Sequence, residues 1–246
     1  MTKRLFLLIS FCAVMFGAQA QEYVFHKGML KMPYREKSYG NAQDGKSMLV
    51  VYLHPKQARG HQNETQTRTA GYKAIDHYLD SVKANAVLLA PQCEEARHWN
   101  EYSSPVGKFF SDVVLDFIED YANHHNIDKR RIYVLGESFG GSGVWRLVTD
   151  YPGYFAAAMP AVCSPKLNRL ERFVKLNKAA KTPLCVVIGE RDQVYDPTVM
   201  APHIEKLNKE KCNLKYIILP GLNHQQACRG AYTNEALDWL FSNQKK

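Results

Sequence analysis

The stretch that decides the fold is Val134-Leu135-Gly136-Glu137-Ser138-Phe139-Gly140-Gly141. An apolar, β-type segment (131–135) runs into it, and a segment of helical composition (142–148) follows it. The stretch therefore holds a G-x-S-x-G motif at a sharp turn from strand to helix, where the serine backbone is strained and side chains two positions away would collide. Because the turn ends a strand, we expect the Ser138 hydroxyl to project from the carboxyl edge of a sheet.

Backbone N–H groups near this turn form a candidate oxyanion hole. The Phe139 N–H is the first expected donor, because it lies next to Ser138 where the helix begins. The second donor is expected in the loop His54-Pro55-Lys56-Gln57, which follows another apolar strand. The proline of this loop has no N–H, so Lys56 or Gln57 is predicted to donate. The histidine of the loop is interpreted as a structural hydrogen-bonding residue beneath it.

Strands and helices alternate along the rest of the chain. Apolar runs of strand length occur at 47–53, 86–90, 131–135, 156–160, 184–189 and 214–219. Helices are predicted at about 68–82, 106–124, 142–151, 168–178, 199–208 and 234–242, and short antiparallel edge strands before residue 47. This alternation favours an α/β fold with a mostly parallel sheet, helices on both faces, and a single domain without a large lid.

A serine needs a base and an orienting carboxylate before it acts as a nucleophile near neutral pH. Both are expected at the carboxyl ends of the parallel strands. Asp192 and His224 follow the last two predicted strands, and the chain order Ser, Asp, His is the order expected for this architecture. His224 is predicted to take the proton of Ser138, and Asp192 to orient the imidazole. Asp196 is the alternative carboxylate.

The loop at 97–100 contributes candidate substrate contacts. Trp99 and His98 are predicted to line a cleft for one half of the substrate, and an aromatic packed over the site is the alternative for Trp99. The cysteine spacing matches no zinc site, and the sequence implies no metal ion and no organic cofactor.

The first 20 residues have the features of a signal peptide. Lys3 and Arg4 precede an apolar run (5–16), and Ala18-Gln19-Ala20 is a small-x-small cleavage site. The run is too short to span a bilayer. We therefore expect a signal peptide at 1–20, a catalytic domain at 21–246, a secreted or periplasmic location, and no stable membrane insertion once the signal is removed.

The distribution of positive charge along the chain argues against nucleic-acid binding. The formal net charge is +8, and removal of Lys3 and Arg4 lowers it to +6. No basic block or basic stretch with interleaved aromatics stands out, so the surplus is interpreted as scattered solvated lysines. Attraction to an acidic polysaccharide is a minor hypothesis.

The number of cysteines is odd once the predicted signal peptide is removed. Of six cysteines, Cys12 lies in the predicted signal peptide, which leaves five. In an oxidising compartment at least one thiol then stays unpaired or pairs between chains. A bridge between Cys212 and Cys228 and buried free thiols are both open alternatives.

Several motifs together resemble the α/β-hydrolase superfamily. They are, in order, Val51–His54, Arg59–Asn63, Ala90–Cys93, Ile127–Tyr133, Gly136–Gly141, Gly189–Asp192 and Gly221–His224. From about Ser47 to the C-terminus the chain resembles exported esterases of the polyhydroxybutyrate depolymerase, feruloyl esterase and acetylxylan esterase group, and their prolyl-oligopeptidase-like relatives. One departure is the loop after the first parallel strand, where that group usually has His-Gly followed by further glycines.

The resemblance implies a serine esterase that forms an acyl-enzyme. We expect a secreted enzyme that removes feruloyl or acetyl groups from plant polysaccharide, so that its partner is an ester-bearing saccharide. Two alternatives are a peptidase-like or polyester-cleaving serine hydrolase, and a non-catalytic carbohydrate-binding protein on a hydrolase scaffold. The intact Ser138, Asp192 and His224 argue against the latter, and the altered oxyanion loop argues for it.

Overall fold

The computed structural model describes residues 21–27, 30–40, 45–99, 102–103 and 108–245, so the predicted signal peptide lies outside the described residues. The main sheet has eight strands in the order β1-β2-β4-β3-β7-β8-β9-β10. They are β1 (Gln21–Lys27), β2 (Leu30–Tyr39), β3 (Ser47–Leu53), β4 (Ala86–Pro91), β7 (Ile127–Glu137), β8 (Ala157–Ala161), β9 (Leu184–Gly189) and β10 (Leu214–Leu219). In this order β1 pairs with β2 and β2 with β4 antiparallel, and the neighbours from β4 through β3 to β10 pair parallel. The predicted mostly parallel sheet with antiparallel edge strands is confirmed.

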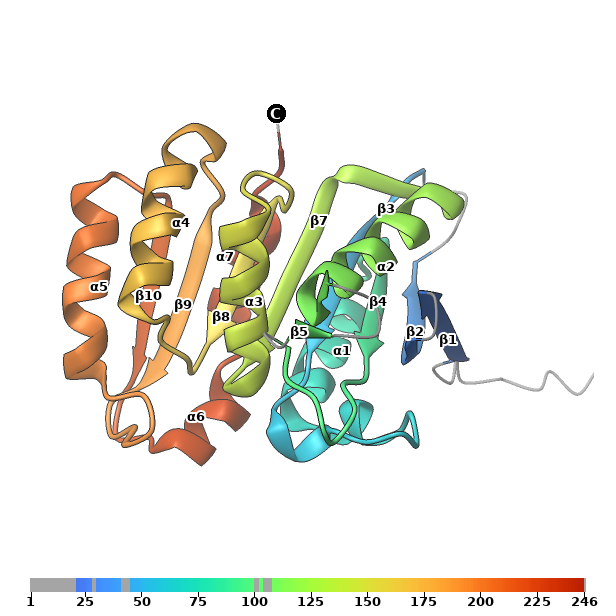
Figure 1. Cartoon of the computed structure of the whole chain (residues 1–246), viewed down its shortest axis with the longest axis horizontal. Coiled ribbons are helices and arrows are strands. Elements are labelled where there is room, and N and C mark those ends of the chain that lie inside the picture. The colour runs from blue at the N-terminus through green and yellow to red at the C-terminus, as the bar shows by residue number, and fades with distance from the viewer. Residues whose placement is uncertain (1–20, 28–29, 41–44, 100–101, 104–107, 246) are drawn as a thin grey trace, which may run out of the picture.

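Helices cover both faces of the sheet. They are α1 (Ala70–Ser81), α2 (Phe110–His124), α3 (Phe139–Asp150), α4 (Leu167–Ala180), α5 (Pro197–Lys209), α6 (His224–Gly230) and α7 (Asn234–Ser242). Short elements are η1 (Lys56–Ala58), η2 (Thr65–Arg68) and the hairpin of β5 (Tyr102–Ser103) and β6 (Lys108–Phe109). In Figure 1, α2 to α5 lie in front of the sheet and α1 and α7 behind it.

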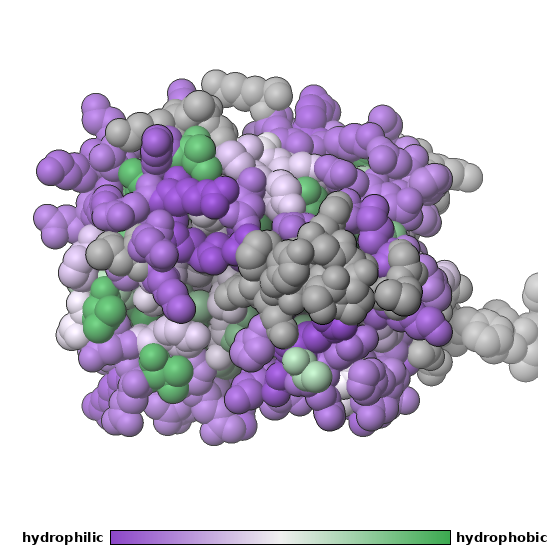
Figure 2. Space-filling model, in the orientation of Figure 1, coloured by the Kyte–Doolittle hydropathy of each residue, from purple (hydrophilic) through white to green (hydrophobic). Residues whose placement is uncertain are grey.

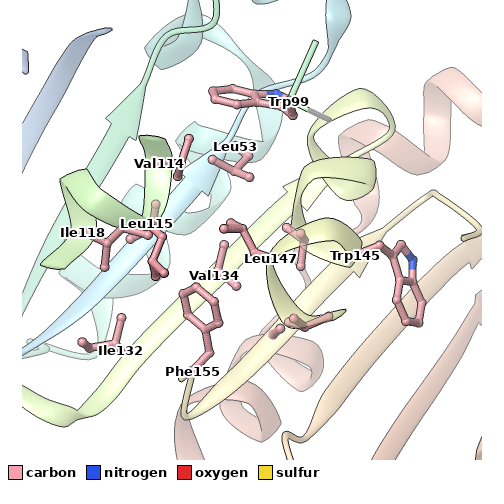
Figure 3. Close-up of a cluster of buried hydrophobic side chains, with 14 of the residues drawn as sticks. Leu53, Trp99, Val114, Leu115, Ile118, Ile132, Val134, Trp145, Leu147 and Phe155 are labelled. Atoms are coloured by element: carbon pink, nitrogen blue, oxygen red, sulfur yellow. The ribbon is translucent and has the colours of Figure 1, made fainter. Parts of the chain in front are cut away.

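Two buried clusters, one on each face of the sheet, form the core. The front cluster joins Val113, Val144 and Ile204 from three helices to the strands, and the rear cluster joins Ile75 and Leu237. Figure 3 shows the front cluster, where side chains of β7, α2 and α3 meet. The helical periodicity of apolar residues predicted this packing, because each helix buries one face against the sheet. No helix in the described ranges is both long and apolar enough to cross a bilayer.

The turn from β7 into α3 is held by close backbone packing. A Cβ atom added at Gly136 would lie 2.7 Å from the carbonyl carbon of Gly140 and 2.8 Å from the carbonyl oxygen of Leu53. A Cβ atom at Gly140 would overlap that same oxygen at the end of β3. Both glycines are therefore required by steric contact between neighbouring backbones, as the motif predicts.

No disulfide joins the described cysteines, which are Cys93, Cys163, Cys185, Cys212 and Cys228. The structure thus contradicts the first alternative, a disulfide between Cys212 and Cys228. Cys93, Cys163 and Cys185 are buried, and Cys212 and Cys228 are half-buried.

Substituting Gly140→Ala should destabilise the fold, because the new methyl group meets backbone atoms that cannot rotate away. We expect a loss of about 3 kcal/mol in the free energy of unfolding, measured by urea denaturation. Gly230→Ala is the matched control, since its nearest neighbour would be a Leu222 side-chain carbon at 3.5 Å. The control should change stability by less than about 1 kcal/mol. Equal effects of the two substitutions would contradict this packing.

Candidate active site

Ser138 occupies the sharp turn between β7 and α3. Its backbone has φ 54° and ψ −115°, a strained conformation for a residue with a side chain. Its N–H donates to the carbonyl oxygen of Ala161 in β8 at 3.0 Å. The surrounding structure thus holds Ser138 in a conformation that directs its hydroxyl away from the core, and the side chain is half-buried.

The structure brings the three predicted residues into one hydrogen-bonded line. The Ser138 hydroxyl oxygen lies 3.0 Å from His224 Nε2, and His224 Nδ1 lies 2.8 Å from Asp192 Oδ2. Because a carboxylate only accepts, Nδ1 carries the proton and Nε2 accepts from the serine hydroxyl. The Asp192 side chain is fully buried, and its other oxygen accepts the N–H groups of Val194 and Tyr195 at 2.8 and 2.9 Å. The carboxylate is therefore fixed on both oxygens.

His224 begins a helix that the sequence analysis missed. We expected a loop after the last strand, whereas His224 is the first residue of α6. Asn223 caps this helix: its side chain accepts the Gln226 N–H at 3.0 Å, and the Gln226 side chain accepts the Asn223 N–H at 3.1 Å. The reciprocal pair fixes the backbone at His224. The spacing of Asn223 and Gln226 is the sequence signal that could have predicted the helix.

The rival acidic residues are engaged elsewhere. Asp196 caps α5 by accepting the Thr198 N–H and hydroxyl, both at 2.7 Å, and these bonds hold the pKa of its carboxyl below the usual value. Glu190 accepts the Gly221 N–H at 2.6 Å. Of the acidic residues that follow β9, Asp192 is thus the one bonded to His224.

The three candidate oxyanion donors lie at the starts of two helices. Phe139 is the first residue of α3, and Lys56 and Gln57 are the first two residues of η1. N–H groups at these positions have no acceptor within their own helix. Lys56 and Gln57 each line a cavity that Ser138 also lines. Their role as donors stays a prediction.

His54 supports this loop from below. It is fully buried, its Nδ1–H donates to the Pro55 carbonyl at 2.8 Å, and its Nε2 accepts the Cys93 N–H at 2.9 Å. Burial lowers the pKa of its imidazole to about 4. The neutral ring is therefore a structural hydrogen-bonding group, in agreement with the sequence interpretation.

Ser138 lies between two cavities. The α6 cavity, of about 630 Å³, is lined by residues that include Gln57, Arg68, Glu137, His224, Cys228 and Arg229. The α4 cavity, of about 620 Å³, is lined by residues that include Lys56, His98, Trp145, Lys166, Arg169 and Tyr195. An ester whose carbonyl carbon lies at Ser138 therefore has room for its acyl part on one side and its alcohol part on the other.

The prediction for Trp99 was wrong, whereas His98 lines the α4 cavity. Trp99 is 1% exposed and donates from its indole nitrogen to the His54 carbonyl at 3.1 Å. Its ring lies 6.2 Å from that of Phe139, measured between centroids. Figure 3 shows Trp99 above Leu53 at the edge of the core cluster. Trp99 is thus the packed aromatic of the alternative interpretation.

Cys228 is a neighbour of the site that the sequence analysis missed. Its sulfur lies 3.8 Å from His224 Nε2, one turn further along α6. Burial raises the pKa of this thiol to about 12, so the thiol stays protonated at neutral pH. The i, i+4 spacing would have indicated the contact had α6 been predicted.

Glu137, immediately before Ser138, is a buried carboxyl group. Tyr52 donates to one of its oxygens at 2.7 Å and Tyr232 to the other at 2.6 Å. Burial raises its pKa to about 7, and the two hydrogen bonds oppose this shift. Because Tyr232 follows α6, this carboxyl links the serine turn to the segment that carries His224.

The described residues contain no group of three or more His, Cys, Asp or Glu side chains arranged to hold a metal ion. The hydrogen-bonded side chains at the site are a serine, an imidazole and a buried carboxylate.

Comparison with known proteins gives a family and a fold. The model of the dienelactone hydrolase family matches residues 61–239. A ferri-bacillibactin esterase of Bacillus subtilis (strain 168) is 27% identical over 124 residues, which are 47% of this chain and 43% of that protein. The match thus spans less than half the length of this relative.

Solved structures share the α/β-hydrolase fold. A thermostable esterase superposes with a TM-score of 0.73 and 24% identity, covering 92% of this chain and 63% of that one. A feruloyl esterase module of Clostridium thermocellum, complexed with sinapinate, has a TM-score of 0.70 and 14% identity, covering 92% and 89%. At these identities the likeness shows the fold alone.

The pKa of Glu137 predicts a pH dependence of stability. The carboxyl has an ordinary pKa of 4.5 and a folded-state pKa of about 7, so between these pH values the folded chain binds more protons than the unfolded chain. Its contribution is therefore fully present below pH 4.5 and is lost as the pH rises through 7.

Glu137→Gln removes this titration. The free energy of unfolding of the wild type, relative to that of the variant, should fall by about 2.5 kcal/mol between pH 5 and pH 8. Urea denaturation of both proteins at each pH measures this, and the subtraction cancels the other titrating groups. A relative stability that is independent of pH would show that the carboxyl titrates normally.

Proposed function

The chain belongs to the dienelactone hydrolase family and is a hydrolase, and within that family we propose that it is an exported serine esterase acting through Ser138. The observation that carries the proposal is the hydrogen-bonded line from Asp192 through His224 to Ser138, which ends between two cavities. Serine, histidine and aspartate in this arrangement are the groups that acyl transfer requires.

In the proposed reaction His224 Nε2 takes the proton of the Ser138 hydroxyl while its oxygen attacks the ester carbonyl carbon. The negative charge that develops on the carbonyl oxygen would be stabilised by the Phe139 N–H and by the Lys56 or Gln57 N–H. His224 then protonates the departing alcohol, leaving an acyl group on Ser138. Asp192 keeps the imidazole in the required tautomer throughout.

A water molecule completes the cycle in the second half of the reaction. His224 takes a proton from the water, whose oxygen attacks the acyl-enzyme, and the same donors stabilise the second tetrahedral intermediate. His224 returns the proton to Ser138 as the carboxylic acid leaves. The protonated thiol of Cys228 beside Nε2 takes no part in these steps.

We favour feruloyl or acetyl esters of plant polysaccharide as substrates. The likeness to a feruloyl esterase module supports this by analogy of fold. The half-buried Ser138, and a connection from β8 to β9 that consists of α4 and its flanking loops, suit a substrate that projects from a polymer. The 27% identical relative makes ferri-bacillibactin a second candidate substrate.

Release of ferulate and of acetate from arabinoxylan oligosaccharides tests the proposal, with ferri-bacillibactin and 4-nitrophenyl acetate assayed alongside. Ser138→Ala should lower kcat about 10⁴-fold or more, because the nucleophile is lost. Ser81→Ala is the control, since its hydroxyl donates to the Tyr78 carbonyl at the end of α1. The control should retain full activity.

Each outcome has a distinct meaning. Ferulate or acetate release that depends on Ser138 supports the esterase and identifies its acyl group. Cleavage of 4-nitrophenyl acetate alone supports a serine hydrolase but not the polysaccharide substrate, and it favours a peptidase-like or polyester-cleaving enzyme. Binding of oligosaccharide with no turnover of any ester would contradict the proposal and favour the carbohydrate-binding alternative.

A further inference from the structure

The described residues that line the α4 cavity beside Ser138 carry positive charge without a matching negative charge. Lys56, Lys166 and Arg169 line it, and none of its described lining residues is Asp or Glu. Lys56 and Lys166 are exposed, and Arg169 is half-buried. The face of the molecule that carries α4 is largely hydrophilic, with small separate hydrophobic patches (Figure 2).

Arg169 is a cation with no partner of its own. Among the described residues its guanidinium makes no hydrogen bond or ion pair. The nearby carboxylate of Asp150 is shared by Arg146 and by Arg172, which lies 3.5 Å away. Two guanidinium groups therefore share one carboxylate, whereas that of Arg169, which lines the cavity, forms no ion pair with a described residue.

The surroundings of Arg169 disfavour its charge. Burial lowers the pKa of its guanidinium, Arg146 and Arg172 lower it further, and Asp150 only partly opposes them. A half-buried cation without a partner is costly, because it has lost part of its hydration and gained no hydrogen bond in return. An anion entering the cavity would supply that partner.

The position of Arg169 relates it to the reaction. Ser138 and Arg169 line the same cavity, with the rings of Trp145 and Tyr195 among its walls. A substrate held at Ser138 and extending into this cavity would therefore share it with aromatic surface and with the guanidinium of Arg169. The combination suits a group that is apolar near the ester and negatively charged further away.

We propose that the α4 cavity binds a carboxylate carried by the substrate, with Arg169 as its principal partner and Lys166 and Lys56 at the mouth. The planar guanidinium matches a carboxylate in a two-point hydrogen bond. The inference rests on the proposed esterase function and narrows it to esters bearing an acidic group. The carboxylate is on the acyl part or on the alcohol part, such as an acidic sugar.

Matched pairs of chromogenic and acetyl esters test the proposal on the wild type. For the acyl side the pairs are 4-nitrophenyl monoesters of succinic and adipic acid and their methyl-capped forms. For the alcohol side the pair is 3-acetoxybenzoate and its methyl ester. We expect kcat/KM to favour the carboxylate form in one of the two series, and the preference to shrink as salt is raised.

Variants then assign the preference to Arg169. Arg169→Met should lower the ratio of kcat/KM for the carboxylate ester to that for its capped partner about 10- to 100-fold, mainly through KM. Arg172→Met is the matched control, because this arginine is exposed on the same helix and is paired with Asp150. It should leave the ratio within about twofold of that of the wild type. Arg169→Lys, which keeps the charge, should restore part of the ratio.

Three outcomes would overturn the proposal. They are no preference for the carboxylate form in either series, a ratio unchanged in Arg169→Met, and equal effects of Arg169→Met and Arg172→Met. If Arg169→Met fails to fold, the proposal is tested by the preference of the wild type and by the ratio of the two kcat/KM values in Arg169→Lys. If the carboxylate proposal fails but capped esters are still hydrolysed in a Ser138-dependent way, the proposed esterase function is retained. If no ester is hydrolysed at all, the proposed esterase function is itself contradicted.

Discussion

The rest of the structure depends on the close approach of the first turn of α3 to the carboxyl end of β3. Gly136 and Gly140 allow this approach, because any side chain would meet the Leu53 carbonyl or the opposite backbone. The same contact brings the Ser138 turn against the loop that begins η1. One steric constraint therefore fixes the relative positions of the candidate nucleophile, the start of α3 and the candidate oxyanion donors.

Much of this arrangement could be predicted from the sequence, because each signal is local. The strands Ser47–Leu53, Leu184–Gly189 and Leu214–Leu219 have the predicted bounds, since predominantly apolar runs of that length fit a parallel strand. The pairing of Asp192 with His224 also follows, because parallel strands end at the same edge. The interpretation of His54 as a structural residue was also confirmed, and its cause is local, namely the hydrogen bond from His54 to the carbonyl of the adjacent Pro55.

The features that were missed depend on contacts between distant segments. Trp99 is buried because its indole nitrogen reaches the His54 carbonyl, 45 residues away, which no local pattern reveals. The charge of the α4 cavity was likewise hidden, because Lys56 and Arg169 lie far apart in the chain and appear as scattered surface cations. The α6 helix is the exception, since its capping pair was present in the sequence. The fold and the candidate nucleophile can thus be predicted from local sequence, whereas the charge of the α4 cavity depends on contacts between distant segments.

The reaction of the protein with a fluorophosphonate tests the central claim most directly, namely that His224 makes Ser138 nucleophilic. Intact-protein mass and peptide mapping should show one adduct per chain, on Ser138. Its rate of formation should fall at least about 10³-fold in His224→Ala, because the general base is lost. An adduct on another residue, no adduct, or a rate that is independent of His224 would contradict the account.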